Sequence, residues 1–188
     1  MGLAESAFAQ QMYSGTLVKE KAKIYLLDDA KVTHLLKSDD KTVYNTLLSL
    51  ETGDSVVLSG KQTGEQIIYV ESLLRVGIQK ILGMWMGKDE FLKFDNFDDF
   101  RSFEPNFENN KLVGIFAQKF RYYLIPDSSG RFVISYTNSQ SYEIAAATIS
   151  LSETKLAIDM IDNNTGKVKE RKKYDRIINK EVSFANPK

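Results

Sequence analysis

The sequence predicts a mainly β protein built from two small domains. Most of its 188 residues fall into short stretches of alternating apolar and polar side chains that end in Gly or Asp turns, which is the pattern of half-buried strands. The 11 Phe and 9 Tyr add large side chains that favour a pleated surface. The pattern changes at Gly83-Met84-Trp85: strands with one helix precede this point, and strand after strand follows it.

The first domain is expected at residues 12–78, after a lead-in at residues 1–11. Its helix should begin after Ser38-Asp39-Asp40, which offers N-caps, and should place Val43, Tyr44, Leu47 and Leu48 on one apolar face. Thr52-Gly53-Asp54 ends this helix. Strands are predicted at residues 12–19, 22–27, 32–36, 55–59 and 66–73, with the helix at 41–50 between the third and the fourth strand.

This order of elements resembles the OB-fold, a five-stranded Greek-key barrel with a helix between its third and fourth strands. The small bacterial OB type carries a Gly in its first strand, a Tyr-Leu pair in its second strand and a Gly-Asp-x-Val-x-Leu-x-Gly fourth strand. The matching residues here are Gly15, Tyr25-Leu26 and residues 53–60. The resemblance covers residues 12–76 and implies an OB-like barrel.

The second domain is expected at residues 79–188, joined to the first through a short rigid connection near residues 75–80. Turn sequences at 126–130, 138–139, 152–154 and 162–166 separate successive strands, so we expect hairpins and an up-and-down antiparallel sheet able to close into a barrel. The predicted strands are residues 81–85, 90–95, 118–125, 131–137, 142–150, 155–161 and 167–177, with a Phe-rich stretch after the second.

Gly83-x-Trp85 on a first strand, with Arg176 at the end of the last, resembles the lipocalin-like family. In that family the Trp plugs the closed end of the barrel and the Arg packs across its indole. The resemblance therefore implies structural roles for Gly83, Trp85 and Arg176, with Arg171 as the substitute for Arg176. About 100 residues leave little loop between eight strands, so this barrel should be shallow with a small cavity or none.

The Phe-rich stretch is the first candidate for a ligand site. Phe91, Phe94, Phe97, Phe100 and Phe103 recur every three residues. They could form an exposed aromatic surface for a lipid, a peptide or a partner, or they could pack the core from two strands. Asp95 or Asn96 could also cap a short helical turn here. The ligand-binding candidates are Phe91, Phe94, Phe100, Phe103 and Tyr122.

No catalytic constellation and no cofactor site are predicted. The acidic cluster of Asp95, Asp98 and Asp99 lacks EF-hand spacing and is interpreted as solvated turn carboxylates, and Asp159 and Asp162 as hairpin-turn residues. His34 is the single histidine, expected at the surface or half-buried, without partners for a triad or a zinc site. No Gly-rich loop carries a phosphate-binding Lys-Ser/Thr. We therefore expect no enzyme, no metal and no cofactor.

The compartment is predicted from the N-terminal residues. Ala7-Phe8-Ala9 resembles a signal-peptidase site, although a frayed lead-in is an equal interpretation, and the absence of Cys leaves the choice open. No apolar run reaches about 18 residues, so no transmembrane segment is expected. We expect an exported bacterial protein, periplasmic or secreted, with a cytoplasmic protein as the alternative.

The distribution of charge along the chain distinguishes the possible classes of partner. Residues 1–78 carry eight cationic and ten acidic side chains, a balance of −2, whereas residues 166–188 carry +5. Lys167, Lys169, Arg171 and Lys173 share one face of an alternating strand, which either guards an edge or contacts an acidic surface. The expected function is non-enzymatic binding of a small apolar or peptidic ligand or of a protein partner. An OB-type nucleic-acid binder and a structural module are the alternatives.

The charge balance predicts that the protein does not bind single-stranded DNA or RNA at physiological salt, because phosphate neutralisation supplies most of such affinity. A fluorescence-anisotropy titration with labelled oligonucleotides at ~150 mM salt should give a Kd weaker than about 10⁻⁶ M. Sub-micromolar binding would overturn the prediction.

Overall fold

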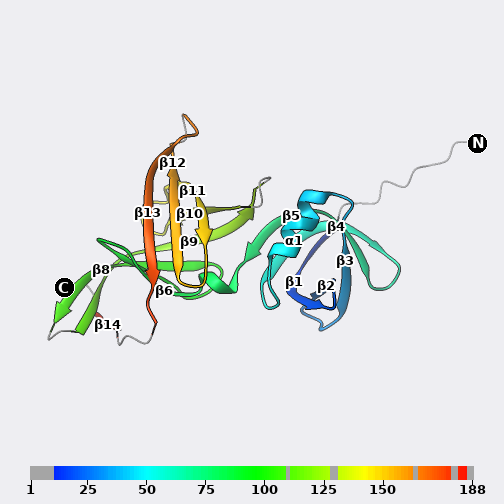
Figure 1. Ribbon diagram of the computed structural model, residues 1–188, viewed down its shortest axis with the longest axis horizontal. Coiled ribbons are helices and arrows are strands. Elements are labelled where there is room, and N and C mark those ends of the chain that lie inside the picture. Colours follow the sequence, from blue (N-terminus) through cyan, green and yellow to red (C-terminus); the bar gives the residue numbers. More distant parts are fainter. Residues whose placement is uncertain (1–10, 109–110, 128–130, 163–164, 179–181, 186–188) are drawn as a thin grey trace, which may run out of the picture. The chain divides into compact units, whose positions relative to one another are not determined.

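A computed structural model describes residues 11–108, 111–127, 131–162, 165–178 and 182–185. These residues form fourteen strands, one α-helix and one 3₁₀ turn, so the mainly β prediction is confirmed (Figure 1). The chain divides into two compact units, with the boundary between Val76 and Gly77. No helix in the described part of the chain is both long and apolar enough to cross a bilayer.

The first unit is a ring of five strands. β1 pairs antiparallel with β2 and with β4, β2 pairs antiparallel with β3, and β5 closes the ring beside β3 and β4. The β3–β5 pair is parallel, which requires a crossover, and α1 and β4 lie within it. The elements are β1 (Gln11–Glu20), β2 (Lys23–Leu27), β3 (Thr33–Lys37), α1 (Lys41–Ser49), β4 (Ser55–Thr63) and β5 (Ile67–Gly77).

Helix α1 begins at the predicted cap but buries a narrower face than the sequence suggested. The Asp40 carboxylate accepts hydrogen bonds from the backbone N–H of Thr42 and Val43, at 2.7 and 3.1 Å. Leu47 is fully buried, whereas Tyr44 and Leu48 are exposed. The expected four-residue apolar face is therefore wrong, because the buried residues of this nine-residue helix are Thr46 and Leu47.

The second unit is a closed eight-stranded antiparallel barrel. Each strand from β6 to β13 pairs with the next, and β13 returns to pair with β6. The 3₁₀ turn η1 (Gln79–Ile81) precedes it. The strands are β6 (Gly83–Met86), β7 (Phe91–Phe94), β8 (Asp99–Glu108), β9 (Lys111–Pro126), β10 (Phe132–Asn138), β11 (Ile144–Leu151), β12 (Lys155–Ile161) and β13 (Val168–Arg176).

Two strands of the second unit go beyond the sequence prediction. β9 begins at Lys111, seven residues before the predicted start, and β14 (Val182–Ala185) pairs parallel with its first part. Residues 112–117 form an apolar run around Gly114 without clear alternation, so periodicity does not reveal this strand. The Phe-rich stretch forms β7, a turn and β8, which excludes the helical alternative there.

One end of the barrel is closed by Trp85. Its side chain is fully buried, and its indole N–H donates to the Ile81 carbonyl of η1 over 2.7 Å. The Arg176 guanidinium lies 4.4 Å from the centre of the indole ring and donates to the Leu82 carbonyl over 3.0 Å and to the Lys80 carbonyl. The guanidinium thus joins the last strand of the barrel to the segment before the first.

Gly83 makes this close packing possible. Its φ of 116° lies in a region that side-chain-bearing residues avoid, and a Cβ added there would stand 3.3 Å from the Arg176 guanidinium. A larger residue at this position would strain the backbone and press on Arg176.

Truncating Trp85→Ala should lower the free energy of unfolding of the second unit by about 3–5 kcal/mol, because it empties the closed end of the barrel. Arg176→Ala should cost about 1–3 kcal/mol, through loss of the cation–π contact and of two bonds to carbonyls. Urea denaturation followed by far-UV circular dichroism measures both changes.

Arg121→Ala is the matched control, because it removes the same side chain from an exposed position of β9 and should change stability by less than about 0.5 kcal/mol. Equal costs for Arg176→Ala and Arg121→Ala would contradict a structural role for Arg176.

Candidate ligand-binding site in the barrel

The inner face of β13 is polar. Side chains alternate along a strand, so Glu170, Lys172, Tyr174 and Arg176 share one face and Arg171, Lys173 and Asp175 share the other. The first set lies inside the barrel: Arg176 covers Trp85, and the remaining three line a cavity above it. The last strand therefore carries charge into the barrel.

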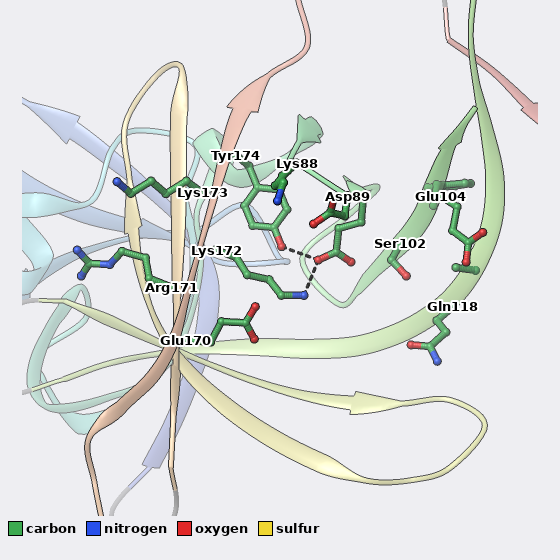
Figure 2. Close-up of a pocket in the computed structure, with 14 residues that line it drawn as sticks. Lys88, Asp89, Ser102, Glu104, Gln118, Glu170, Arg171, Lys172, Lys173 and Tyr174 are labelled. Carbon is green, nitrogen blue, oxygen red and sulfur yellow. Dashed lines mark hydrogen bonds and ion pairs between the residues drawn. The ribbon is translucent and has the colours of Figure 1, made fainter. Parts of the chain in front are cut away.

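A cluster of three side chains forms around Glu90, which precedes β7. The Lys172 ammonium donates to Glu90 Oε1 over 2.7 Å, and the Tyr174 hydroxyl donates to the same oxygen over 2.9 Å. Figure 2 shows the two bonds as dashed lines that start at Lys172 and Tyr174 of β13. The Glu90 and Lys172 side chains keep 29% and 41% of their exposure, so water still reaches the pair.

The cluster shifts the protonation of its members. Burial, followed by the Glu90 carboxylate, raises the pKa of Tyr174 far above its ordinary value. Burial lowers the pKa of Lys172, but the hydrogen bond and charge of Glu90 outweigh it, so the net shift is upward. Burial, together with Glu90 and Glu170, raises the pKa of Tyr136 against the opposing charge of Lys172. At neutral pH Lys172 is therefore an ammonium, and the Tyr174 hydroxyl and that of neighbouring Tyr136 are neutral.

The cavity, called here the chamber, occupies about 210 Å³ inside the barrel. Its polar members, besides the cluster, are Ser102, Gln118, Tyr136 and Glu170. Its apolar walls come from β7, β8, β9, β10 and β12, through Leu92, Phe100, Phe120, Ile134, Ile158 and Met160. A small molecule could place an apolar body against these walls and a polar group at Glu90, Lys172 and Tyr174.

The chamber opens through a gap in the barrel wall, called here the notch. β6 and β7 are short, so the wall is interrupted beyond their turn at residues 87–90, between residues 170–174 of β13 and residues 102–104 of β8. The notch encloses about 920 Å³ and shares Glu90, Lys172 and Tyr174 with the chamber. Figure 2 shows Ser102, Glu104 and Gln118 facing the β13 side chains across this space.

The five aromatic residues proposed from the sequence fall into two groups. Phe100 lines the chamber, and Phe94 and Tyr122 pack against it with ring centres 4.9 and 5.8 Å away. Phe91 and Phe103 stack 4.9 Å apart on the opposite face of the sheet, where Phe184 of β14 lies 4.9 Å from Phe103. The structure thus brings Phe100 to the chamber wall and Phe103 to the edge of the notch, and it places Phe91, Phe94 and Tyr122 in packing.

Sequence reasoning missed Glu90, Lys172 and Tyr174. The signal was present in residues 168–176, where one alternating face carries Lys169, Arg171 and Lys173 and the other carries the polar residues of the chamber. Which of the two faces is internal could not be read from an alternation in which both are polar.

The other acidic residues and the histidine are engaged elsewhere. Asp95 forms ion pairs with Lys93 at 3.0 Å and Arg101 at 2.7 Å, which lower its pKa although burial opposes them. Asp159 lies within β12, not in the expected hairpin turn, and takes two 2.5 Å bonds from Arg171.

His34 is buried on β3, so the expected surface or half-buried position is wrong; its Nε2 lies 3.1 Å from Asp28 Oδ2. In the part of the chain that the structure describes, no three His, Cys, Asp or Glu side chains are grouped to hold a metal ion.

No protein-family model, no curated protein and no solved structure matches the chain.

The cluster predicts a loss of stability in alkali. A pKa raised by folding means tighter proton binding in the folded state, so the contribution is complete below the unfolded pKa and is lost as the pH rises toward the folded value. The free energy of unfolding should therefore fall from about pH 9 to about pH 12, where Tyr and Lys lose their protons in the unfolded chain. Tyr174→Phe should make this fall shallower in urea titrations, and identical slopes would contradict the assignment.

Proposed function

We propose that the protein is a non-enzymatic binding protein of the bacterial envelope whose second unit takes a small amphipathic molecule into the chamber. The observation that carries the proposal is a chamber with apolar walls and one polar cluster, Glu90, Lys172 and Tyr174, where it meets the notch. Ligand sites in proteins combine such apolar walls with a few placed polar groups. The envelope assignment rests on Ala7-Phe8-Ala9, which lies outside the described residues.

The proposal also assigns an OB-like fold to the first unit and a lipocalin-like fold to the second. The ring of strands in the first unit, with its parallel β3–β5 pair and the helix between β3 and β4, supports an OB-like domain. The closed antiparallel barrel with Arg176 over Trp85 supports a lipocalin-like domain. The same fold can serve many functions, so the chemistry of the ligand follows from the lining of the chamber and not from the fold.

The charges of the chamber favour a cationic or hydrogen-bond-donating head on the ligand. Glu90 and Glu170 bring two carboxylates to the lining and Lys172 brings one ammonium. An amine entering from the notch would find acceptor oxygens, whereas a carboxylate would meet like charge. The chamber volume of about 210 Å³ limits the apolar body to a short chain or a single ring.

Hexylamine, hexanol and hexanoate test the proposal, because they share one apolar chain and differ in their heads. Isothermal titration calorimetry should give hexylamine a Kd on the order of 1 mM and at least about 10-fold tighter binding than hexanoate. Glu90→Gln should reduce this preference, since it removes the carboxylate. The absence of binding by all three compounds would overturn the proposal.

Met160→Trp should abolish binding, because Met160 is half-buried in the chamber wall and a larger side chain would fill the space. Ile144→Trp is the matched control: Ile144 lies on β11 of the same barrel, 72% exposed, and should leave affinity unchanged. Equal affinity in the two variants would place the bound molecule outside the chamber.

A further inference from the structure

The inner part of the chamber is almost wholly apolar. The polar residues of the chamber lining also line the notch, with the exception of Tyr136. The residues that line the chamber but not the notch are Leu92, Phe100, Phe120, Ile134, Tyr136, Ile158 and Met160. The Tyr136 hydroxyl donates to the Met160 sulfur over 3.3 Å, so its proton is already engaged. A group that enters this far therefore finds one hydroxyl oxygen and no free side-chain donor.

Three aromatic rings meet in this inner part and form what is called here the aromatic corner. Phe100 and Phe120 stack with their ring centres 4.7 Å apart, and the Tyr136 ring stands 5.9 and 5.6 Å from them at angles of 70° and 83°. Phe120 and Tyr136 are half-buried, so part of each side chain stays accessible. The face of an aromatic ring carries partial negative charge and attracts a cation. The aromatic corner can therefore hold a cation without hydrogen bonds.

One carboxylate at the mouth of the chamber has no positive partner. Glu90 is paired with Lys172, whereas Glu170 forms no hydrogen bond or ion pair with any residue that the structure describes. Glu170 lies directly opposite Met160 in the pairing of β12 with β13, so the two side chains share the inner face of the barrel. Burial is the main cause of the raised pKa of Tyr136, and the charge of Glu170 adds to it. The charged residues of the chamber lining thus leave one negative charge uncompensated, and it acts on the aromatic corner.

The lining distinguishes between kinds of ligand. A primary ammonium carries three N–H donors, and burying it in the inner chamber would leave most of them without an acceptor. A quaternary ammonium has no N–H to satisfy, and its methyl groups pack well against apolar and aromatic walls. A neutral apolar group would fit the same walls, but it would gain nothing from the charge of Glu170. A methylated cation is therefore the group that uses both the rings and the carboxylate.

We propose that the chamber binds a small quaternary ammonium compound, with its methylated nitrogen at the aromatic corner and Glu170 as its counter-charge. The rest of the ligand extends toward the notch, where Ser102 and Gln118 supply polar side chains for a hydroxyl group. This inference rests on the proposal that the chamber is the ligand site, and it adds the chemical class of the ligand.

Choline and its neutral carbon analogue 3,3-dimethylbutan-1-ol test the inference, because the two molecules have the same shape and differ in charge. Isothermal titration calorimetry with the full chain should give choline at least about 10-fold tighter binding than the alcohol. Equal affinity, or tighter binding of the alcohol, overturns the inference. If hexylamine binds and choline does not, the inference fails although the chamber remains a ligand site. If none of these compounds binds, the inference and the proposed function both fail.

Variants separate the contribution of the charge from that of the ring. Glu170→Gln should weaken choline binding at least about 5-fold, whereas Glu104→Gln, the same change at an exposed position that lines only the notch, should alter it by less than about 2-fold. Tyr136→Leu should weaken binding at least about 5-fold, and Tyr136→Phe should retain it because the ring is kept. Tyr123→Leu is the matched control, since Tyr123 lies on β9 with 43% exposure and does not line the chamber.

Circular dichroism reports whether each variant is folded. Wild-type affinity for choline in a folded Glu170→Gln or Tyr136→Leu variant overturns the inference. So does choline binding that survives Met160→Trp, since the cation would then lie outside the chamber.

Discussion

The second unit depends on how its last strand meets its first. β13 and β6 pair at only two positions, Asp175 with Met86 and Arg176 with Trp85, and a barrel without this contact would be an open sheet with two long edges. Arg176 reinforces the contact in three ways: it is the strand partner of Trp85, it stacks on the indole, and it bonds carbonyls of the segment that precedes β6. Trp85 and Arg176 thus seal one end of the barrel and also join its first strand to its last.

The unequal lengths of the strands around this contact explain the opening at the other end of the barrel. β6 and β7 are four residues each, whereas β13 has nine and β8 has ten. Long strands on both sides of a short hairpin leave the wall incomplete beyond the turn. The notch lets water reach Glu90 and Lys172, which keep part of their exposure. In a sealed barrel this ion pair would cost several kcal/mol per ion in lost hydration. The open wall therefore allows the barrel to hold this ion pair in its interior.

Aromatic side chains pack on both faces of the sheet in the second unit. Phe94, Phe100 and Tyr122 pack inside, next to the chamber, and Phe91 and Phe103 pack outside under Phe184. Because both faces of β7 and β8 are covered by rings, the hairpin is held firmly although it is short. The chamber is consequently bounded on one side by a rigid aromatic wall and on the other by polar side chains of β13, which suits an amphipathic ligand.

The sequence by itself determined most of the strands, the single helix with its Asp40 cap, the hairpin turns and the residues that close the barrel. The strands, the helix and the turns depend on local alternation and turn chemistry, whereas Gly83, Trp85 and Arg176 were predicted from the resemblance to the lipocalin-like family. The tertiary structure alone decided the face on which Glu170, Lys172 and Tyr174 lie, their meeting with Glu90 and the gap beside them. Both faces of β13 are polar, so periodicity could not tell inside from outside, and the notch arises from the relative lengths of strands that are distant in the sequence. Contacts of that kind are set by how the whole sheet closes, which no local pattern encodes.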